Sequence, residues 1–396
     1  MNQTNKPINL RSKVPKILFL GTQIEFAGAQ RVLISQARWF HEKGYAVQAV
    51  FLYDKQSLLK QWQLSNPFPV LSLEGRKPGS DPISNTIKLL GAIVKLFRLL
   101  RNGPDVIVSF TPHSNLIGLP VAWFAGVPVR IGTVHGQISG ASKLLAWFHG
   151  RLVNSKIPRI TVCVSEQVKR AVVKNEHANP NRLIVIENGI DLELYESGDV
   201  DRQHIRKELK VPGKGVMIIS VGRLAVEKGH TYLLDAFSKV IPTHPNVFLV
   251  IVGDGPLRSQ LDAQAKELVI SDRMIFVGLR GDVINLLKSS EIYIQPSLSE
   301  GLSLALLEAL AASLPIVATK IPGFVSILDD EKTALLVPPA TSDELAVAME
   351  RLILDGSFRN RIARSGHELV KERYSVAAMC KAYERLIQKY FPNELQ

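Results

Sequence analysis

The feature that most constrains the fold of this chain is a repeated alternation of short apolar runs with amphipathic stretches of helical period. The same alternation occurs in both halves of the 396 residues. It predicts parallel strands joined by crossover helices, since parallel neighbours need a long connection. The strands predicted in the first half are Lys16–Leu20, Val47–Leu52, Val106–Phe110, Val129–Thr133, Ile160–Val164 and Arg182–Ile186. Those predicted in the second are Gly215–Gly222, Val247–Val252, Met274–Val277, Ile292–Ile294 and Ile316–Ala318.

The connections between these runs divide the chain into two similar units. A loop is expected from Gly21 to Gly28, followed by a helix that ends at Gly44. The polar, aperiodic stretch Ser197–Gln203 is typical of a linker. We predict an α/β chain of two Rossmann-like domains facing a cleft. Its parts are a polar extension (1–15), a first domain (16–195), a linker (196–212), a second domain (213–376) and a C-terminal helix (377–396) packed back on the first domain.

The net charge of +12 is unevenly divided. Residues 1–190 carry an excess of 15 positive charges and residues 191–396 an excess of three negative ones. The first half is therefore expected to face an anionic surface or substrate. Basic segments interleaved with aromatics and nucleic-acid modules are lacking, so nucleic acid is not expected as a partner. With two distant cysteines and neither a signal segment nor a spanning stretch, the expected location is cytoplasmic, with peripheral contact to the inner membrane face.

Two carboxylates eight residues apart mark the candidate site of the second half. Glu300 is expected in a strand-to-helix turn and Glu308 about two turns into the helix. The N–H groups of Gly301, Leu302 and Ser303 are then unpaired donors at the helix start, where an anion binds well. A surface glutamate at a turn and a helix glutamate in an ion pair are the alternative interpretation.

A second motif, Gly222–Gly229, follows the first strand of the second half and places Arg223 and Lys228 near the start of a helix. Fixed cations of this kind can neutralise a departing diphosphate. A solvated basic turn is the alternative.

At these motifs the chain resembles the retaining nucleotide-sugar glycosyltransferases of the GT-B fold, glycosyltransferase family 4. The resemblance covers about residues 16–391 and is strongest in the second domain. It implies that Glu300 contacts the donor sugar and Glu308 the ribose. It also implies that Arg223 and Lys228 bind the diphosphate.

Five further positions take roles from the resemblance. Gly253, in Gly253–Pro256, matches a turn near the nucleotide, and Gly278 and Leu279 match backbone contacts to the base. Gly28 opens a helix where the family has two glycines and this chain has Ala27, so Gly28 would lie at the donor phosphate. His135 follows a strand and is followed by Gly136, and the family's histidine there contacts the donor sugar. Simple turns and a structural histidine are the alternatives.

No cofactor or metal is expected, since the nucleotide sugar is a co-substrate. The triplet Asp199–Asp201 lies in the linker without a preceding strand and is interpreted as coincidence. The chain departs from the family at Lys320–Ser326, where Ser326 replaces a glutamate, and at Ala334, which replaces a glycine. Sugar, base and acceptor stay open.

The expected function is metal-independent, retaining transfer of a sugar, most simply from a UDP-sugar, to an acceptor hydroxyl. The expected setting is surface-polysaccharide, lipopolysaccharide or glycolipid synthesis, with a glycan or lipid-linked acceptor. The amphipathic segments 87–101 and 142–152 are interpreted either as membrane-facing helices over such an acceptor or as ordinary crossover helices. A non-catalytic nucleotide-sugar-binding subunit and an epimerase or phosphorylase of the same fold are the alternative functions.

Overall fold

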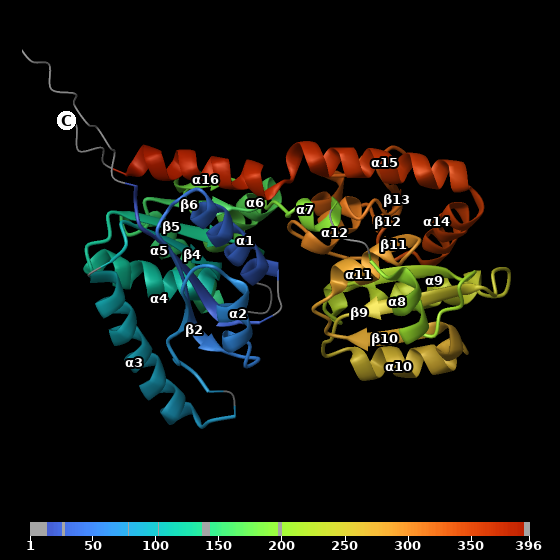
Figure 1. The fold of residues 1–396 in the computed structure, drawn as a ribbon, viewed down its shortest axis with the longest axis horizontal. Helices are drawn as coiled ribbons and strands as arrows, with labels where there is room; N and C mark the ends of the chain where they lie inside the picture. The colour runs from blue at the N-terminus through green and yellow to red at the C-terminus, as the bar shows by residue number, and fades with distance from the viewer. Residues whose placement is uncertain are drawn as a thin grey trace, which may run out of the picture.

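The computed structural model describes residues 14–25, 28–77, 79–101, 103–136, 143–196 and 200–391. Two parallel sheets lie side by side, each covered by helices on both faces (Figure 1). The first sheet has the order β3-β2-β1-β4-β5-β6-β7 and the second β10-β9-β8-β11-β12-β13. In both, the strand order reverses beside the domain's first strand, and ligands of such sheets bind at that switch point. The predicted fold class is confirmed.

In the first domain the strands are β1 (Ile17–Ile24), β2 (Val47–Asp54), β3 (Val70–Ser72), β4 (Val106–Phe110), β5 (Val129–Val134), β6 (Ile160–Cys163) and β7 (Leu183–Val185). Its helices are α1 (Gly28–Glu42), α2 (Leu59–Ser65), α3 (Pro82–Arg101), α4 (Thr111–Phe124), α5 (Lys143–Asn154), α6 (Glu166–Glu176) and the short α7 (Glu193–Glu196).

In the second domain the strands are β8 (Val216–Val221), β9 (Val247–Val252), β10 (Met274–Gly278), β11 (Ile292–Gln295), β12 (Ile316–Thr319) and β13 (Leu335–Val337). The helices that follow α7 are α8 (Arg202–Glu208), α9 (His230–Val240), α10 (Arg258–Glu267), α11 (Val283–Lys288), α12 (Leu304–Ala311), α13 (Pro322–Val325), α14 (Ser342–Leu354), α15 (Gly356–Arg373) and α16 (Val376–Tyr390).

Three predictions about strands were wrong. The loop expected from Gly21 is instead the second half of β1, which stays paired with β2 as far as Ile24 and Asp54. The strands β3 and β13 were missed, because three residues are too few to show a period.

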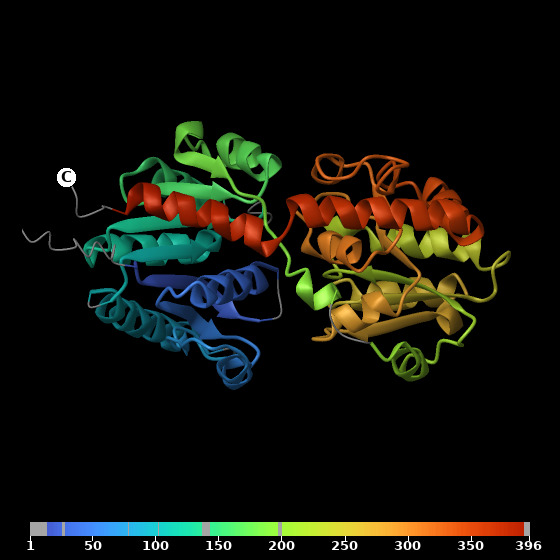
Figure 2. The same cartoon turned by 45° about the horizontal axis from the view of Figure 1, so that its top comes forward.

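The chain passes between the domains at two points that lie side by side. Ile190 N–H donates to the Tyr374 carbonyl at 2.8 Å, and Val376 N–H donates to the Ile190 carbonyl at 2.9 Å. After this crossing α16 runs over the first domain while α15 lies over the second (Figure 2). Met379, Cys380 and Tyr383 of α16 are buried against the first sheet's core. This helix therefore belongs to the first domain in space.

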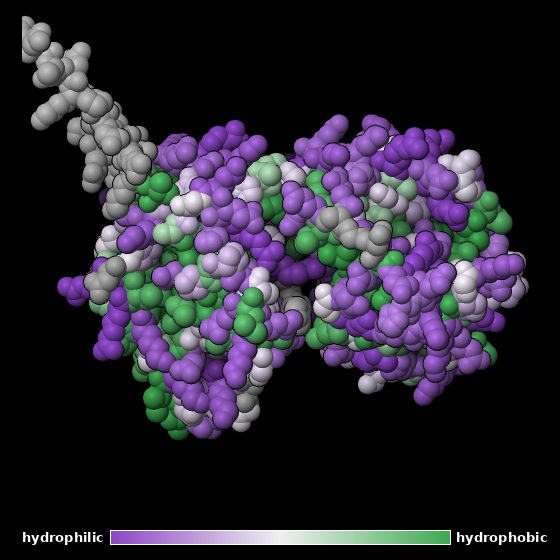
Figure 3. Space-filling model, in the orientation of Figure 1, coloured by the Kyte–Doolittle hydropathy of each residue, from purple (hydrophilic) through white to green (hydrophobic). Residues whose placement is uncertain are grey.

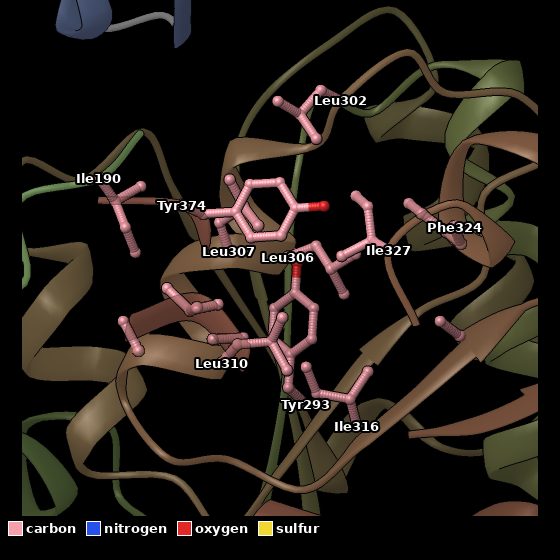
Figure 4. Packing of buried hydrophobic residues seen from close by; sticks show 14 of the residues in the cluster. Ile190, Tyr293, Leu302, Leu306, Leu307, Leu310, Ile316, Phe324, Ile327 and Tyr374 are labelled. Atoms are coloured by element: carbon pink, nitrogen blue, oxygen red, sulfur yellow. The ribbon is translucent and has the colours of Figure 1, made fainter. Parts of the chain in front are cut away.

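The core of the second domain continues up to the crossing. Tyr293 of β11, Leu306 and Leu310 of α12 and Tyr374 pack together around the start of α12 (Figure 4). All four are almost fully buried. At roughly 25 cal/mol for each Å² of apolar surface buried, this cluster holds α12 firmly under the cleft.

Candidate functional site

The site lies where the carboxyl ends of the two sheets face each other. Gly301, in the loop after β11, packs against the backbone of His135, which follows β5. A Cβ on Gly301 would lie 3.8 Å from the His135 carbonyl oxygen and 3.0 Å from a methyl of Val168. Gly28 likewise faces Leu304 at the start of α12, with 3.0 Å between a built Cβ and the Leu304 side chain. Both domains therefore contribute to one site.

Glu300 is held from three sides within the second domain. Lys228 Nζ lies 2.5 Å from Glu300 Oε1. Gln295 Nε2 donates to the same oxygen at 2.9 Å and Ser297 Oγ at 3.0 Å. The Lys228 and Glu300 side chains are only 22% and 10% exposed. Three donors to one oxygen leave Oε2 of this carboxylate as the acceptor for a ligand hydroxyl.

Gln295 is itself fixed by the strand that carries it. The Tyr293 hydroxyl donates to Gln295 Oε1 at 3.1 Å, and Gln295 Nε2 also donates to Ser303 Oγ at 2.8 Å. All three residues are buried. Sequence reasoning missed Gln295 and Ser297, although a glutamine ending a buried strand before a turn is a polar residue that needs a partner.

The start of α12 differs from the prediction. The helix begins at Leu304, and Ser303 is its N-cap, accepting the Leu306 N–H at 3.3 Å. Gly301 and Leu302 therefore precede the helix, and the Leu302 side chain is buried in the core. Glu308 lies just over one turn into α12, not two. The error arose because Leu302 continues the apolar spacing of the helix into the loop.

Glu308 is buried and reaches the first domain. Its Oε1 lies 2.5 Å from Arg31 Nη2 of α1, and its Oε2 has no hydrogen-bond partner in the described part of the chain. Burial raises the pKa of Glu308 above its ordinary value, while the charge of Arg31 opposes that rise. Arg31 was not singled out from the sequence, although a cation in the first turn of α1 is conspicuous, since that position repels positive charge.

Arg223 and Lys228 lie on either side of a tight turn. Lys228 closes a 3₁₀ turn (Val226–Lys228) directly before α9. Arg223 is exposed and, among the residues that the structure describes, forms no ion pair. The Lys228 aliphatic chain passes within 3.7 Å of the Cβ position of Gly222. An anion bound between these two cations would contact Arg223 and also Lys228, whose ammonium group already pairs with Glu300.

Gly253, Gly278 and Leu279 form one side of this turn. Gly253 has φ of +136°, and a Cβ there would lie 2.0 Å from the Gly222 carbonyl oxygen, so only glycine fits. Its N–H donates to the Gly278 carbonyl at 2.8 Å. Leu279 beside it is 55% exposed. These three residues lie together, as a common role would require.

His135 is stacked on Phe110, with ring centroids 5.0 Å apart. Its Nε2 lies 3.0 Å from Thr133 Oγ1, and its buried Nδ1 has no partner among the described residues. Burial lowers the pKa of His135 to about 4, so the ring is neutral at ordinary pH. A neutral imidazole with one unpaired nitrogen can exchange a hydrogen bond with a sugar hydroxyl.

The motif departures and the acidic triplet also have structural places. Gly323 packs on the backbone of Glu300 and Gly301, and Ser326 Oγ donates to the Gly323 carbonyl at 2.9 Å. Asp201 caps α8 by accepting the His204 N–H at 2.9 Å, while Asp199 and Ala27 lie outside the described residues. Within the described ranges, no group of three or more His, Cys, Asp and Glu is placed to hold a metal ion.

In comparisons with known proteins, each domain matches a glycosyltransferase family model. A model described as "Glycosyltransferase Family 4" matches residues 26–194, and one described as "Glycosyl transferases group 1" matches residues 201–369.

Two relatives illustrate the likeness in sequence. The chain is 28% identical over 302 residues, 72% of its length and 77% of the relative's, to an Escherichia coli UDP-Gal:alpha-D-GlcNAc-diphosphoundecaprenol alpha-1,3-galactosyltransferase. It is 22% identical, over 78% of its length and 84% of the relative's, to the Staphylococcus aureus capsular polysaccharide biosynthesis glycosyltransferase CapM. Among solved structures, Anabaena HepE in complex with UDP and glucose has a TM-score of 0.82 at 22% identity, covering 95% of this chain and 100% of that one.

Proposed function

The chain is a glycosyltransferase of family 4, and from this premise we propose that it moves a sugar from a UDP-sugar to an acceptor hydroxyl with retention of anomeric configuration. The observation that carries the proposal is the Lys228–Glu300 pair, in which Gln295 and Ser297 hold the carboxylate. Arg223, the second cation of this motif, forms no ion pair with any residue that the structure describes. The UDP donor is supported by a relative named for UDP-Gal and by the similar fold of a UDP-bound protein.

The two cations act on the leaving group. As the glycosidic bond breaks, negative charge builds on the diphosphate. Arg223 and Lys228 are placed to stabilise it, so that no metal ion is required in this scheme. Preset donors of this kind are worth about 2.7–4 kcal/mol each in a transition state.

The carboxylates and the histidine act on the sugar and the ribose. The Glu300 carboxylate accepts hydroxyl hydrogen bonds from the donor sugar, and the free Oε2 of Glu308 accepts one from the ribose. His135 contacts the far edge of the sugar. In a retaining, front-face displacement the acceptor oxygen attacks from the side that the diphosphate leaves, and a diphosphate oxygen takes the acceptor proton.

We place the acceptor on the first domain. A relative named for a diphosphoundecaprenol acceptor and another named for capsular polysaccharide support a glycan or lipid-linked acceptor in surface-polysaccharide, lipopolysaccharide or glycolipid synthesis. None of the described helices is long and apolar enough to cross a bilayer. The excess of 15 positive charges in residues 1–190 supports access to a lipid-linked acceptor by peripheral contact of the first domain with the inner membrane face.

Calorimetric titration without metal tests the donor site. UDP, GDP and ADP and their hexose conjugates are titrated into wild type, Lys228→Ala and Glu300→Ala. We expect binding of the UDP series, weakened by both substitutions, and circular dichroism should show both variants folded. If the GDP or ADP series binds instead, the donor is a sugar linked to that nucleotide and not a UDP-sugar. No binding in any series would contradict the proposed donor site, whereas binding without any product would favour the non-catalytic nucleotide-sugar-binding subunit. A product assay distinguishes transfer from epimerisation or phosphorolysis.

A further inference from the structure

A second hollow of the first domain lies outside the site described above. It has a volume of about 510 Å³ and opens beyond the carboxyl ends of β2 and β3, against the middle of α3. We call it the basic pocket; its lining residues include Arg76, Lys77, Lys88 and Lys95 with Asp54 and Glu74. None of these has a role in the donor site.

The charges of the basic pocket do not cancel. Asp54 already accepts the N–H groups of Leu58 and Leu59, at 3.1 and 2.9 Å, and so caps α2. Glu74 pairs with Lys95 at 2.8 Å. Lys77 and Lys88 form no ion pair among the described residues, so four cations face two engaged carboxylates. The pocket therefore offers an excess of positive charge to an anionic group.

Gly91 keeps this pocket open. It lies in the middle of α3 and faces the pocket, and a Cβ there would meet no atom within 4 Å. Glycine within a helix lowers its stability by roughly 0.5–1 kcal/mol relative to alanine. A helix that places glycine facing a charged hollow leaves room there for a ligand.

The next face of α3 is apolar and exposed. Ile83, Ile87, Leu90 and Val94 recur at spacings of four, three and four residues and are 74%, 65%, 60% and 48% exposed. We call them the apolar stripe. On the same side of the sheet, Leu144, Trp147 and Phe148 of α5 are also 47–62% exposed. Figure 3 shows hydrophobic atoms along α3 and over the region of α4 and α5. The buried face of α3, which packs on the core of the first domain, consists of Ala92, Leu96 and Leu100.

We infer that the basic pocket binds the diphosphate group of a lipid-linked acceptor whose hydrocarbon chain lies along the apolar stripe. The inference rests on the proposed function and names its acceptor class. On α3 the basic residues of the pocket and the apolar stripe form adjoining rows. A lipid with an anionic head would contact both rows, whereas a soluble anion would contact only the basic one.

The pocket also lies toward the donor site. Arg76 lies over the Tyr53 ring, 5.9 Å from its centroid, and the Tyr53 hydroxyl donates to Gln23. Gln23 Nε2 in turn donates to Glu25, which directly follows β1. This row of contacts runs along the carboxyl edge of the first sheet, from the basic pocket to the end of β1.

Vesicle flotation of the full chain tests the inference without any donor sugar. The vesicles are phosphatidylcholine alone, phosphatidylcholine with a polyprenyl diphosphate, and phosphatidylcholine with phosphatidylglycerol at equal charge. We expect tightest binding to the polyprenyl diphosphate vesicles. The double variant Lys77→Glu/Lys88→Glu should weaken that binding by roughly 10- to 100-fold. The control Lys174→Glu, an exposed charge on α6, should change it less than about twofold.

Gly91 supplies a steric test that alters no charge. Gly91→Leu fills the basic pocket and should lose binding to the polyprenyl diphosphate vesicles, whereas Gly91→Ala should retain it and fold at least as stably as wild type. Ile87→Ser/Leu90→Ser should also weaken binding, and inorganic diphosphate should compete only at high concentration.

Equal affinity for phosphatidylglycerol and polyprenyl diphosphate, unaffected by Gly91→Leu, would overturn the inference in favour of a general membrane surface. Full competition by inorganic diphosphate with no effect of Ile87→Ser/Leu90→Ser would overturn the lipid part. Since the assay omits the donor, its failure leaves the calorimetric test of the donor site unaffected, and the converse also holds.

Discussion

The two domains share one sheet topology but hold their polar groups differently at the carboxyl edges. In the second domain, Glu300 is fixed by Lys228, Gln295 and Ser297 of the same domain. In the first, one ring nitrogen of His135 has no partner within the described ranges, and Arg31 pairs with Glu308 across the cleft. The groups around Glu300 are therefore preset, whereas His135 and Arg31 depend on a ligand or on the other domain.

This difference accords with the two proposed ligands. The diphosphate of a nucleotide sugar always presents the same charged groups. Donors fixed in advance stabilise it well, because they need no rearrangement in the transition state. An acceptor is defined by a charged group and an apolar chain, for which the unpaired lysines and the exposed face of α3 suffice. Four predictions test this contrast.

The largest effect is expected at the preset edge. Glu300→Gln keeps the shape of the side chain but removes the charge that holds Lys228, so kcat for transfer should fall about 10²–10³-fold. Steady-state release of the nucleoside diphosphate measures it. Asp343→Asn is a matched control, since its carboxylate also pairs with a lysine at 2.5 Å but is 84% exposed. A similar loss in both variants would contradict the contrast.

The pair between the domains should have the next largest effect, on stability. Arg31→Ala leaves Glu308 buried without its cation, and we expect a loss of about 2 kcal/mol, below the usual 3–5 because Arg31 is 41% exposed. The pKa of Glu308, already raised by burial, should rise further. A carboxyl with a raised pKa stabilises the fold as it protonates, so the loss should shrink as the pH falls.

Urea unfolding of Arg31→Ala, Glu308→Gln and the double variant across acidic pH measures this coupling. If the two single losses simply add, the pair is not a link between the domains.

His135 gives a smaller, pH-dependent effect. Its pKa is lowered to about 4 in the folded chain, against about 6.5 when unfolded. Because the folded state disfavours the charged ring, this histidine should destabilise the fold progressively as the pH falls from about 6.5 toward 4, by roughly 1–3 kcal/mol. Ring-proton NMR should show no titration of His135 near neutrality, and His135→Gln should flatten the corresponding part of the stability profile. A ring pKa above 6 would show that the site is more solvated than the contacts indicate.

The smallest effect is expected on the apolar stripe of α3. Ile87→Ser should change the unfolding free energy by less than about 0.5 kcal/mol, because the side chain is already in water. Leu96→Ala, on the buried face of the same helix, should cost about 2–5 kcal/mol. Equal losses would mean that the stripe packs against another part of the chain.

The sequence predicts the second edge better than the first for a physical reason. Arg223, Lys228 and Glu300 lie in short turns that follow strands, and Glu308 lies in the helix α12 that follows one of these turns, so the spacing of these residues along the chain largely determines their positions in space. The structure brings Lys228 onto Glu300, although 72 residues separate them. Their proposed roles stay predictions.

Other features depend on contacts that leave no local pattern. The pairing of Arg31 with Glu308 joins helices of different domains. The basic pocket combines residues from β2, the segment after β3 and α3, none of which forms a motif alone. The amphipathic segment 87–101 was open to two interpretations. One face of α3 packs on the sheet, as a crossover helix does, while its exposed apolar face leaves membrane contact a prediction.

The position of α16 has a consequence for synthesis of the chain. Domains usually fold in order as they leave the ribosome, the N-terminal one first. Here Phe40 and its neighbours on α1 are covered by a helix that begins at Val376. The first domain therefore reaches its final packing only after the second has been translated. A nascent chain would expose an apolar face of α1 until then. Loss or misfolding of α16 would therefore uncover the core of the first domain, although this helix lies at the other end of the chain.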